Sequence, residues 1–358
     1  MSNKVYKVCI IGLEHVHAPL LYNAFQNDCK DCVEWIGYAQ VSKQPEEVYQ
    51  VDPSWYQRIF DNMKEYDNYL DLLDQKPDIA LVCTDIKTHA EICEETLRRN
   101  IHTVVEKPMA LTVSDAVRMY RAAQQSNAEL VINWPIAWFP AFNKVKELAD
   151  SGIVGDTLRV TYRTPSTRGP FNPDKLPEEI LAQTWWYHTE RGGGSLMDYA
   201  GYGCVLSAWL VKEELPLRAA GFRKNFMMPF MDAEDYSACL LEYQNAVASV
   251  EGSWSTGHSG AIPTGPIVYG TEGTIVADRY SSSVKVYRSK NGKDAEPEVF
   301  EVPKGGTNIG LNFLNHLDDG SALHEMITLE FNMRAMTMLD ACRRAAQSGT
   351  VVSIQKEW

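Results

Sequence analysis

The first third of the chain alternates short apolar runs with helical patterns, and this alternation constrains the fold more than any other feature. Continuous apolar strands separated by amphipathic helices are typical of parallel strands whose two faces are both covered. We therefore expect an α/β domain with a doubly wound parallel sheet, in which ligands bind outside the carboxyl ends of the strands. The predicted strands are residues 5–11, 33–39, 78–84, 101–105 and 129–133.

The alternation of predicted strands and helices ends after residue 133. The segment TLRVTYR at 157–163 alternates apolar and polar residues, as a half-buried strand does. Strand candidates then follow one another without intervening helices, which indicates an α+β domain on a large, mostly antiparallel sheet. We therefore expect two domains, residues 1–133 and 134–358, with the last helix packing back on the first domain. The other strand candidates are residues 237–243, 246–254, 273–278 and 283–288.

Charge and composition exclude several classes of partner. The 358 residues carry a formal net charge of −13, so we expect no binding to nucleic acid or to an anionic membrane. No apolar stretch approaches the roughly 18 residues that a membrane span requires. The first residues lack the apolar core and cleavage site of a secretory signal. These patterns predict a cytoplasmic protein.

The eight cysteines are scattered and lie mostly in apolar segments, where cysteine behaves as a small hydrophobic residue. Cys29 and Cys32 form a C-x-x-C motif. A structural zinc site would need a second such pair or two nearby histidines, and none follows in the sequence. We interpret this motif as a loop with two free thiols.

The first strand runs into Gly12 and then a helix, which is where a dinucleotide-binding fold places its phosphate turn. The stretch reads GLEHVH, so Glu14 and His17 stand where the pattern G-x-G-x-x-G has glycine. A carboxylate repels a pyrophosphate, and an ordinary strand-to-helix turn is an equally good interpretation of this motif alone. His15 and His17 are possible metal ligands, but no third ligand is obvious, and we predict no metal site.

The second predicted strand ends in Gln40, where a fold that holds the ribose of NAD usually has an acid. Ser42 and Lys43 follow. A hydroxyl group and an ammonium group suit a 2′-phosphate better than a carboxylate does, so this pattern favours NADP slightly over NAD. A solvated surface lysine is an equally good interpretation of Lys43.

The fourth predicted strand ends in Glu106, Lys107 and Pro108, at the edge where a doubly wound sheet binds ligands. Pro108 fixes the turn and keeps Lys107 out of helical dihedral angles. Glu106 can hold or neutralise a neighbouring cation. We expect Lys107 to point into the crevice, and a surface lysine in a turn is the alternative.

A second motif lies in the other half of the chain. Three glycines at 192–194 precede a helix in which Asp198 and Tyr202 are four residues apart, so their side chains share one face. An acid and a phenol beside an approachable glycine run can form a site. A buried, hydrogen-bonded pair is the simpler interpretation of this motif alone.

Together these motifs resemble the family of glucose-fructose oxidoreductase, inositol dehydrogenase and MocA (Gfo/Idh/MocA), which are nicotinamide-dependent sugar oxidoreductases. The resemblance covers nearly the whole chain, and the E-K-P and GGG-x-L-x-D motifs at this separation are its most specific part. The matching segments are residues 106–108 and 110–112, Thr84, His89 and Ala90, 139–140, 151–155, 192–198, 269–275 and 312–317.

The resemblance implies a Rossmann domain, NAD or NADP as cofactor, and a homodimer or homotetramer formed through the second-domain sheet. It implies catalytic roles for Lys107 and Asp198, with Tyr202 in place of the usual histidine, as in the branch with glucose-fructose oxidoreductase and dimeric dihydrodiol dehydrogenase. Asp85 and Ile86 replace a common Pro-Asn pair. The implied cofactor contacts are Gly12, Leu13, Glu14, His15, Gln40, Lys43, Thr84, His89, Glu106 and Lys107.

We therefore predict an oxidoreductase that transfers a hydride between a nicotinamide cofactor and a sugar, polyol or related cyclic hydroxyl compound. Tyr202 would donate or accept the proton, and Lys107 would stabilise the phenolate and lower the pKa of that phenol. Asp198 would orient the pair. Two alternatives stay open, namely a ligand-binding relative without hydride chemistry and a nicotinamide-assisted glycosidase.

Three further residues are candidates for substrate binding. Trp185 and Trp186 precede the glycine run, and aromatic rings suit the apolar faces of a sugar. His188 follows them and is a rival acid-base group. Packing inside the protein is the alternative role for all three side chains.

Overall fold

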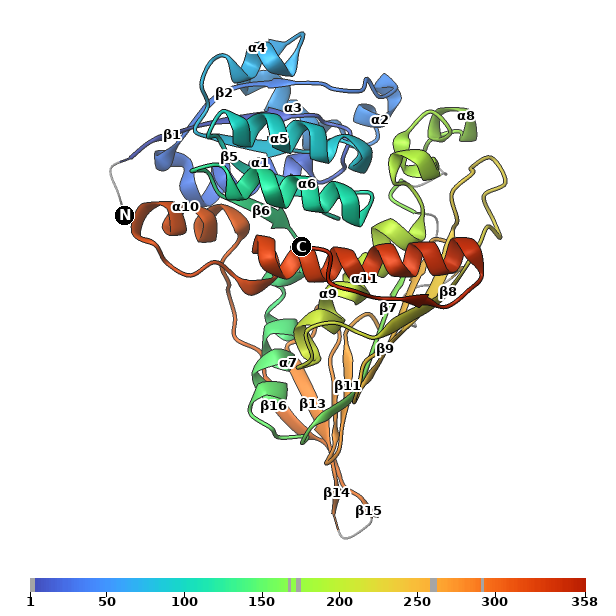
Figure 1. Ribbon diagram of the computed structural model, residues 1–358. Coiled ribbons are helices and arrows are strands. Elements are labelled where there is room, and N and C mark those ends of the chain that lie inside the picture. Colours follow the sequence, from blue (N-terminus) through green and yellow to red (C-terminus); the bar gives the residue numbers. More distant parts are fainter. Residues whose placement is uncertain (1–3, 167–168, 172–174, 258–262, 291–292) are drawn as a thin grey trace.

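Residues 4–166, 169–171, 175–257, 263–290 and 293–358 are described in the computed structural model. The first part of the chain forms a six-stranded parallel sheet with the order β3-β2-β1-β4-β5-β6 (Figure 1). This order confirms the predicted doubly wound fold. The short edge strand β3 was not expected from the sequence. The strands are β1 (Tyr6–Ile11), β2 (Val33–Ala39), β3 (Glu65–Tyr66), β4 (Ile79–Val82), β5 (His102–Glu106) and β6 (Leu130–Asn133).

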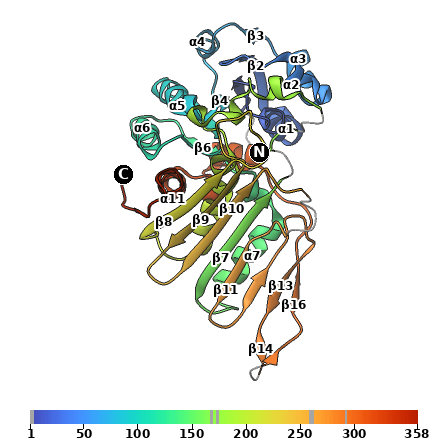
Figure 2. The same ribbon diagram turned by 90° about the vertical axis from the view of Figure 1, so that its right-hand side faces the viewer.

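Helices cover both faces of this sheet. Helices α5 (His89–Arg98) and α6 (Val113–Gln124) pack together on one face, and α1 (Ala18–Cys29) packs with α3 (Pro53–Asn62) on the other (Figure 2). Every residue of β4 is buried, which explains why the strand reads as an unbroken apolar run. The shorter helices are α2 (Glu46–Gln50) and α4 (Tyr69–Leu73).

Thr112 caps the start of α6 with its side chain. The backbone N–H of Asp115 donates to Thr112 Oγ1 over 3.1 Å. A side-chain cap of this kind satisfies one of the free N–H groups at a helix start. The turn that carries Lys107 and Pro108 therefore leads into a well-anchored helix.

The second part of the chain is built on a nine-stranded sheet with the order β16-β13-β12-β11-β7-β10-β9-β8-β17. Strands β7 and β10 pair in parallel, and the other pairs are antiparallel, so the predicted mostly antiparallel sheet is confirmed. The strands are β7 (Thr157–Pro165), β8 (Arg218–Lys224), β9 (Tyr236–Glu242), β10 (Val247–Ser253), β11 (Ile267–Gly270), β12 (Thr274–Val276), β13 (Ser283–Tyr287), β16 (Glu298–Glu301) and β17 (Val352–Ser353), besides the separate hairpin β14 (Ser289–Lys290) and β15 (Lys293–Asp294).

Helices α7 (Pro140–Asp150), α9 (Gly201–Leu210) and α11 (Leu329–Ser348) pack on this sheet. Helix α10 (Ile309–Asp319) returns to the first part of the chain and packs against α1, while α11 lies between β8 and α6 (Figure 1). A buried hydrogen bond of 2.6 Å from Trp134 Nε1 to Asn332 Oδ1 ties α11 to the end of β6. The last helices therefore fasten the two parts together.

The helix with the predicted site residues begins with one π-helical turn, η6 (Leu196–Ala200), and continues as α9. Small residues let it lie close to its neighbours. A Cβ added at Gly203 would meet the Val250 side chain at 2.5 Å, and one added at Gly201 would meet the Trp134 ring at 3.3 Å. Close packing of α9 on β10 thus fixes where Asp198 and Tyr202 point.

All eight cysteines are free thiols. Cys29 ends α1 and Cys32 ends the short helix η1 (Lys30–Cys32), and the pair forms no disulfide. Among the helices of the described ranges, none combines the length and the apolar character needed to span a bilayer. The segment 164–191 includes the end of β7 and the helix α8 (Glu178–Leu181), and its residues 167–168 and 172–174 lie outside the described ones.

Replacing Gly203 by alanine should destabilise the fold. A glycine-to-alanine change inside a helix ordinarily stabilises it by up to about 1 kcal/mol, but the added methyl group at Gly203 would overlap Val250. We expect a loss of about 1–3 kcal/mol in the free energy of unfolding, measured by urea titration. Gly306→Ala is the matched control, since nothing lies within 4 Å of a Cβ there. Equal stability of the two variants would contradict close packing at α9.

Candidate functional site

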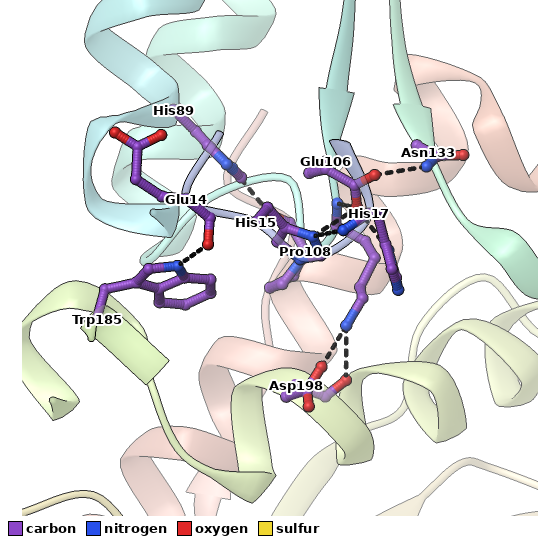
Figure 3. Close-up of polar contacts among 10 residues, drawn as sticks. Glu14, His15, His17, His89, Glu106, Pro108, Asn133, Trp185 and Asp198 are labelled. Atoms are coloured by element: carbon purple, nitrogen blue, oxygen red, sulfur yellow. Dashed lines mark hydrogen bonds and ion pairs between the residues drawn. The ribbon is translucent and has the colours of Figure 1, made fainter. Parts of the chain in front are cut away.

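The tip of β5 brings Lys107 into a buried position between the two parts of the chain. Its side chain is 1% exposed and forms an ion pair with the Asp198 carboxylate (Figure 3). Lys107 Nζ also lies 3.4 Å from the Asp198 carbonyl oxygen and 4.7 Å from the centroid of the Tyr202 ring. The structure therefore brings together the three residues predicted to be catalytic, from elements 91 residues apart in the chain.

Electrostatics decides the protonation state of this trio. Burial lowers the pKa of Lys107, but the Asp198 carboxylate, with Tyr202 and Glu106, raises that pKa above its ordinary value. Burial raises the pKa of Tyr202 to about 12, and the Lys107 ammonium offsets only part of this increase. Lys107 therefore lowers the pKa of Tyr202, as predicted, but the net shift of that pKa is upward because burial has the larger effect. At neutral pH the site holds an ammonium group and an un-ionised phenol.

Glu106 lies at the centre of a second cluster at the same sheet edge. Its carboxylate is fully buried, and Oε1 accepts a hydrogen bond of 2.6 Å from Asn133 Nδ2 (Figure 3). Oε2 lies 3.1 Å from His17 Nδ1 and 3.6 Å from His15 Nδ1. Burial, followed by the neighbouring His17, lowers the pKa of His15 well below its ordinary value, so the His15 imidazole is neutral.

The turn after β1 keeps the shape of a phosphate turn but is filled by one of its own side chains. Gly12 has φ +83°, and its N–H donates to Ala39 O over 2.7 Å. The Glu14 carboxylate folds back across the turn and accepts hydrogen bonds from the N–H groups of Val41 (3.1 Å) and Ser42. Burial raises the pKa of Glu14 to about 7. The carboxylate thus takes backbone donors at the tip of β2.

Trp185 and Trp186 cover the same turn from the second part of the chain. Their rings stack with centroids 3.9 Å apart, and the Trp186 ring lies 4.8 Å from that of His15. Trp185 Nε1 donates to the Glu14 carbonyl oxygen over 2.9 Å (Figure 3). Both indole side chains are buried. The two residues predicted to contact substrate therefore pack on the phosphate turn.

Three other predicted cofactor contacts are buried side chains. Leu13 and Thr84 are buried, and Thr84 Oγ1 donates to the carbonyl oxygen of Asp85 over 3.2 Å. His89 is fully buried, with Nδ1 lying 3.2 Å from the carbonyl oxygen of Pro108. His89 therefore positions the turn that carries Lys107.

The remaining predicted residues lie away from the trio. Gln40 Nε2 donates to Glu65 Oε1 over 2.9 Å, and Lys43 is exposed. His188 Nε2 lies 2.7 Å from the Ala182 carbonyl oxygen, on a half-buried side chain. None of these contacts reaches Lys107 or Tyr202.

Three residues of the site were not expected from the sequence. Asn133 fixes the Glu106 carboxylate. Arg191 pairs with Asp85 at 2.7 Å and so anchors the 185–192 segment on the first part of the chain. Arg279 donates to Tyr162 Oη over 3.3 Å, and its charge lowers the pKa of Tyr202 in part. None of them belongs to a motif, so only the fold reveals their proximity.

The fit of a nicotinamide dinucleotide can be judged from these contacts. Gly12, the sheet edge and Lys107 match the fold that binds such cofactors. The Glu14 side chain, however, is 2% exposed and already holds the amides of Val41 and Ser42, while Trp185 closes the turn. With Glu14 in this place, the residues of the turn do not fit a pyrophosphate.

Two family models match the chain. The first, an oxidoreductase family with an NAD-binding Rossmann fold, matches residues 6–133, and the second, the GFO/IDH/MocA C-terminal domain, matches residues 142–276. The two matches coincide with the six-stranded sheet and with much of the nine-stranded sheet. The family expected from the motifs is therefore the one that matches.

Curated relatives and solved structures agree with these matches. The D-apiose dehydrogenase of Rhizobium rhizogenes is 22% identical over 293 residues, covering 77% of this chain and 79% of the relative. The dTDP-3,4-didehydro-2,6-dideoxy-alpha-D-glucose 3-reductase of Streptomyces violaceoruber is 25% identical over 204 residues, covering 56% of this chain and 54% of the relative. The chain thus spans about half the length of the latter relative.

The fold is shared with the WlbA dehydrogenase of Bordetella pertussis, whose structure contains NADH and UDP-GlcNAcA. The TM-score is 0.73 at 19% identity, with 98% of this chain and 99% of that chain covered. Both domains of the chain are thus found, in the same order, in a solved dehydrogenase structure. On the two model matches and the shared two-part fold, the chain belongs to the Gfo/Idh/MocA oxidoreductase family.

Proposed function

We propose that the protein is an oxidoreductase that interconverts a hydroxyl and a carbonyl group on a sugar, polyol or related cyclic compound, with NAD or NADP as its redox partner. The observation that carries this proposal is the buried meeting of Lys107 with Asp198 and Tyr202 at the carboxyl edge of the parallel sheet. Membership of an oxidoreductase family with an NAD-binding fold supports it.

The protonation states of the trio determine which residue can donate or accept the proton of the reaction. Because the pKa of Tyr202 is about 12, its hydroxyl group is a proton donor at neutral pH and suits reduction of a carbonyl group. Abstraction of a proton from an alcohol needs the phenolate, which is stabilised by the Lys107 ammonium, whose Nζ lies 4.7 Å from the centroid of the Tyr202 ring. Asp198 holds that ammonium in place through the ion pair.

We also propose a slight preference for NADP over NAD. Position 40 is glutamine rather than the acid that binds a ribose diol, and Lys43 lies exposed near the tip of β2. An ammonium group there suits a 2′-phosphate, which supports a lean towards NADP. The N–H of Ser42 already donates to the Glu14 carboxylate, so the proposed preference for NADP depends on Lys43.

Replacing Tyr202 by phenylalanine should lower turnover by about 10²–10⁴-fold, the usual contribution of a general acid-base group. The assay would follow nicotinamide absorbance with D-apiose and myo-inositol as first probes, with both cofactors and in both directions. Tyr243→Phe is the matched control, since within the described ranges the hydroxyl group of this buried phenol has one hydrogen-bond partner, a methionine sulfur at 3.8 Å. Full turnover of Tyr202→Phe would reject the assignment.

The pH profile provides a second readout of the same variant. Alcohol oxidation needs the phenolate, whose fraction rises about tenfold per pH unit below the pKa of about 12. Oxidation by the native protein should therefore accelerate from neutral to alkaline pH, and the phenylalanine variant should lose this slope. A purely structural role of Tyr202 would leave the slope unchanged.

A second candidate function is a relative that binds a ligand but performs no hydride chemistry. The observation that favours it is the Glu14 carboxylate, which occupies the phosphate turn and bonds two backbone amides. Carboxylate and pyrophosphate repel each other strongly when both are desolvated. Dinucleotide binding requires this side chain to move or to be protonated.

Glu14 variants distinguish the two candidates. We expect Glu14→Gly to tighten NADH binding by at least about tenfold, or about 1.4 kcal/mol, and Glu14→Gln, which removes the charge but keeps the bulk, to have a smaller effect. Because the pKa of Glu14 is about 7, the native protein should bind NADH more tightly at pH 6, where the carboxyl group is neutral, than at pH 8. Nicotinamide fluorescence measures both effects. Loss of NADH binding in Glu14→Gly would contradict a repulsive role, and no response in any variant would favour the second candidate.

We also propose that the outer face of the nine-stranded sheet pairs with a second copy of the chain, giving a homodimer or homotetramer. Figure 2 looks onto this face, with α7 behind the strands. Large apolar side chains are exposed there, with Phe222 73% and Leu240 53% exposed. These two residues lie on the adjacent strands β8 and β9, and large exposed apolar patches mark association sites.

Light scattering coupled to size exclusion should therefore give the mass of two or four chains. Phe222→Glu and Leu240→Glu should shift the protein towards a monomer, because each places a charge in the interface. Trp55→Glu is the matched control, since this exposed side chain lies on α3 of the first part. A monomeric native protein would refute the proposal.

A further inference from the structure

His15, His17 and Glu106 bring three potential metal ligands together from two separate loops. The histidines lie in the turn after β1, and the glutamate ends β5. One ligand atom from each lies within 4.8 Å of the others. Glu106 Oε2 is 3.1 Å from His17 Nδ1 and 3.6 Å from His15 Nδ1. The third ligand that the local sequence does not offer is therefore supplied by a neighbouring strand.

The two separations from Glu106 Oε2 match those of a coordination sphere. Zinc binds imidazole nitrogen and carboxylate oxygen at about 2.0–2.2 Å in a tetrahedron, which places two ligand atoms roughly 3.3 Å apart. The separations from Glu106 Oε2 to the two histidines, 3.1 and 3.6 Å, lie on either side of that value. All three ligand atoms lie within 4.8 Å of one another, so a bound cation would draw the histidine nitrogens together.

The surroundings hold each ligand in the required orientation. Asn133 Nδ2 donates to Glu106 Oε1 over 2.6 Å, which turns Oε2 towards the histidines. The Trp186 ring packs on the His15 ring. The backbone N–H of His17 donates to His15 Nδ1 over 3.2 Å, so this nitrogen is unprotonated, and a bound cation would replace that N–H as its partner. Outer partners of this kind are typical of metal sites.

The charge at this sheet edge also favours a cation. Lys107 is engaged by Asp198, and within the described part of the chain no lysine or arginine forms an ion pair with Glu106. The fully buried Glu106 carboxylate is therefore contacted by an amide, a backbone N–H and two histidine rings, and the Lys107 ammonium acts on it from beyond ion-pair distance. Buried carboxylates are ordinarily paired with a cation or bound to a metal.

We propose that His15, His17 and Glu106 form a binding site for a divalent transition-metal ion, with zinc as the best match. Two imidazoles and one carboxylate are a ligand set typical of Zn²⁺ and related ions. Three protein ligands leave a fourth tetrahedral position open to water or a substrate oxygen, next to Lys107 in the chain. The test of this site is independent of the proposed function, because metal binding can be measured without turnover.

The test uses the untagged, full-length protein after removal of metals with a chelator. We expect about one Zn²⁺ per chain by elemental analysis after dialysis, and visible d–d absorption of four-coordinate Co²⁺ when cobalt replaces zinc. His17→Gln and Glu106→Gln should each weaken Zn²⁺ binding in calorimetry by more than about 100-fold, beyond the loss of an outer partner. His316→Gln is the matched control, a partly exposed histidine on α10 outside the cluster.

Two further measurements separate a lost ligand from a lost fold. Thermal unfolding in the presence of chelator compares the variants without metal, and Asn133→Ala, which keeps all three ligands, should weaken Zn²⁺ binding by about 10–100-fold. Equal Zn²⁺ affinity in the native protein, His17→Gln and Glu106→Gln would overturn the proposal. So would the absence of both bound zinc and a cobalt spectrum in the native protein, since the cluster is then a hydrogen-bonded network only.

Discussion

The buried ion pair between Lys107 and Asp198 is the constraint on which the site depends. Both side chains are almost fully buried, and removing either partner would leave an uncompensated charge, at a cost of about 3–5 kcal/mol. The pair forms only if α9 lies close to β10, which Gly203 permits, and only if α11 fastens the two parts together through Trp134 and Asn332. The geometry of the site therefore depends on the packing between the two parts of the chain.

The parallel sheet could be predicted from the sequence because its strands are buried on both faces, as in β4. Strand β8 was missed because alanine and glycine occupy its inner face, where Ala219 and Gly221 are buried, and these residues have weak strand preference. The net pKa shift of Tyr202 could not be predicted either. The sequence shows that a lysine can approach the phenol, but it does not show how deeply the ring is buried, and burial decides the sign.

The phosphate turn is another feature that the sequence predicts only in part. The sequence reveals that Glu14 is unsuited to a pyrophosphate, but only the fold shows that the backbone N–H groups of Val41 and Ser42 donate to its carboxylate. Similarly, His15 and His17 are two residues apart, whereas their common partner Glu106 follows His17 by 89 residues. Spacing in the sequence can identify potential ligands within one loop. The parallel order of β1, β4 and β5 then places Glu106 beside that loop.

The charges of the crevice connect these observations. Glu14, Glu106 and Asp198 contribute carboxyl groups, and Lys107 is the cation paired among them. Two like charges 4 Å apart cost about 4 kcal/mol at an effective dielectric constant of 20, so an anionic cofactor meets a barrier here that a glycine turn lacks. Protonation of Glu14, with its pKa of about 7, removes one of these charges, whereas a cation held by Glu106 would neutralise another. At the edge that binds anions in a dinucleotide fold, the protonation of Glu14 and a cation at Glu106 would therefore both decide how strongly an anionic cofactor is repelled.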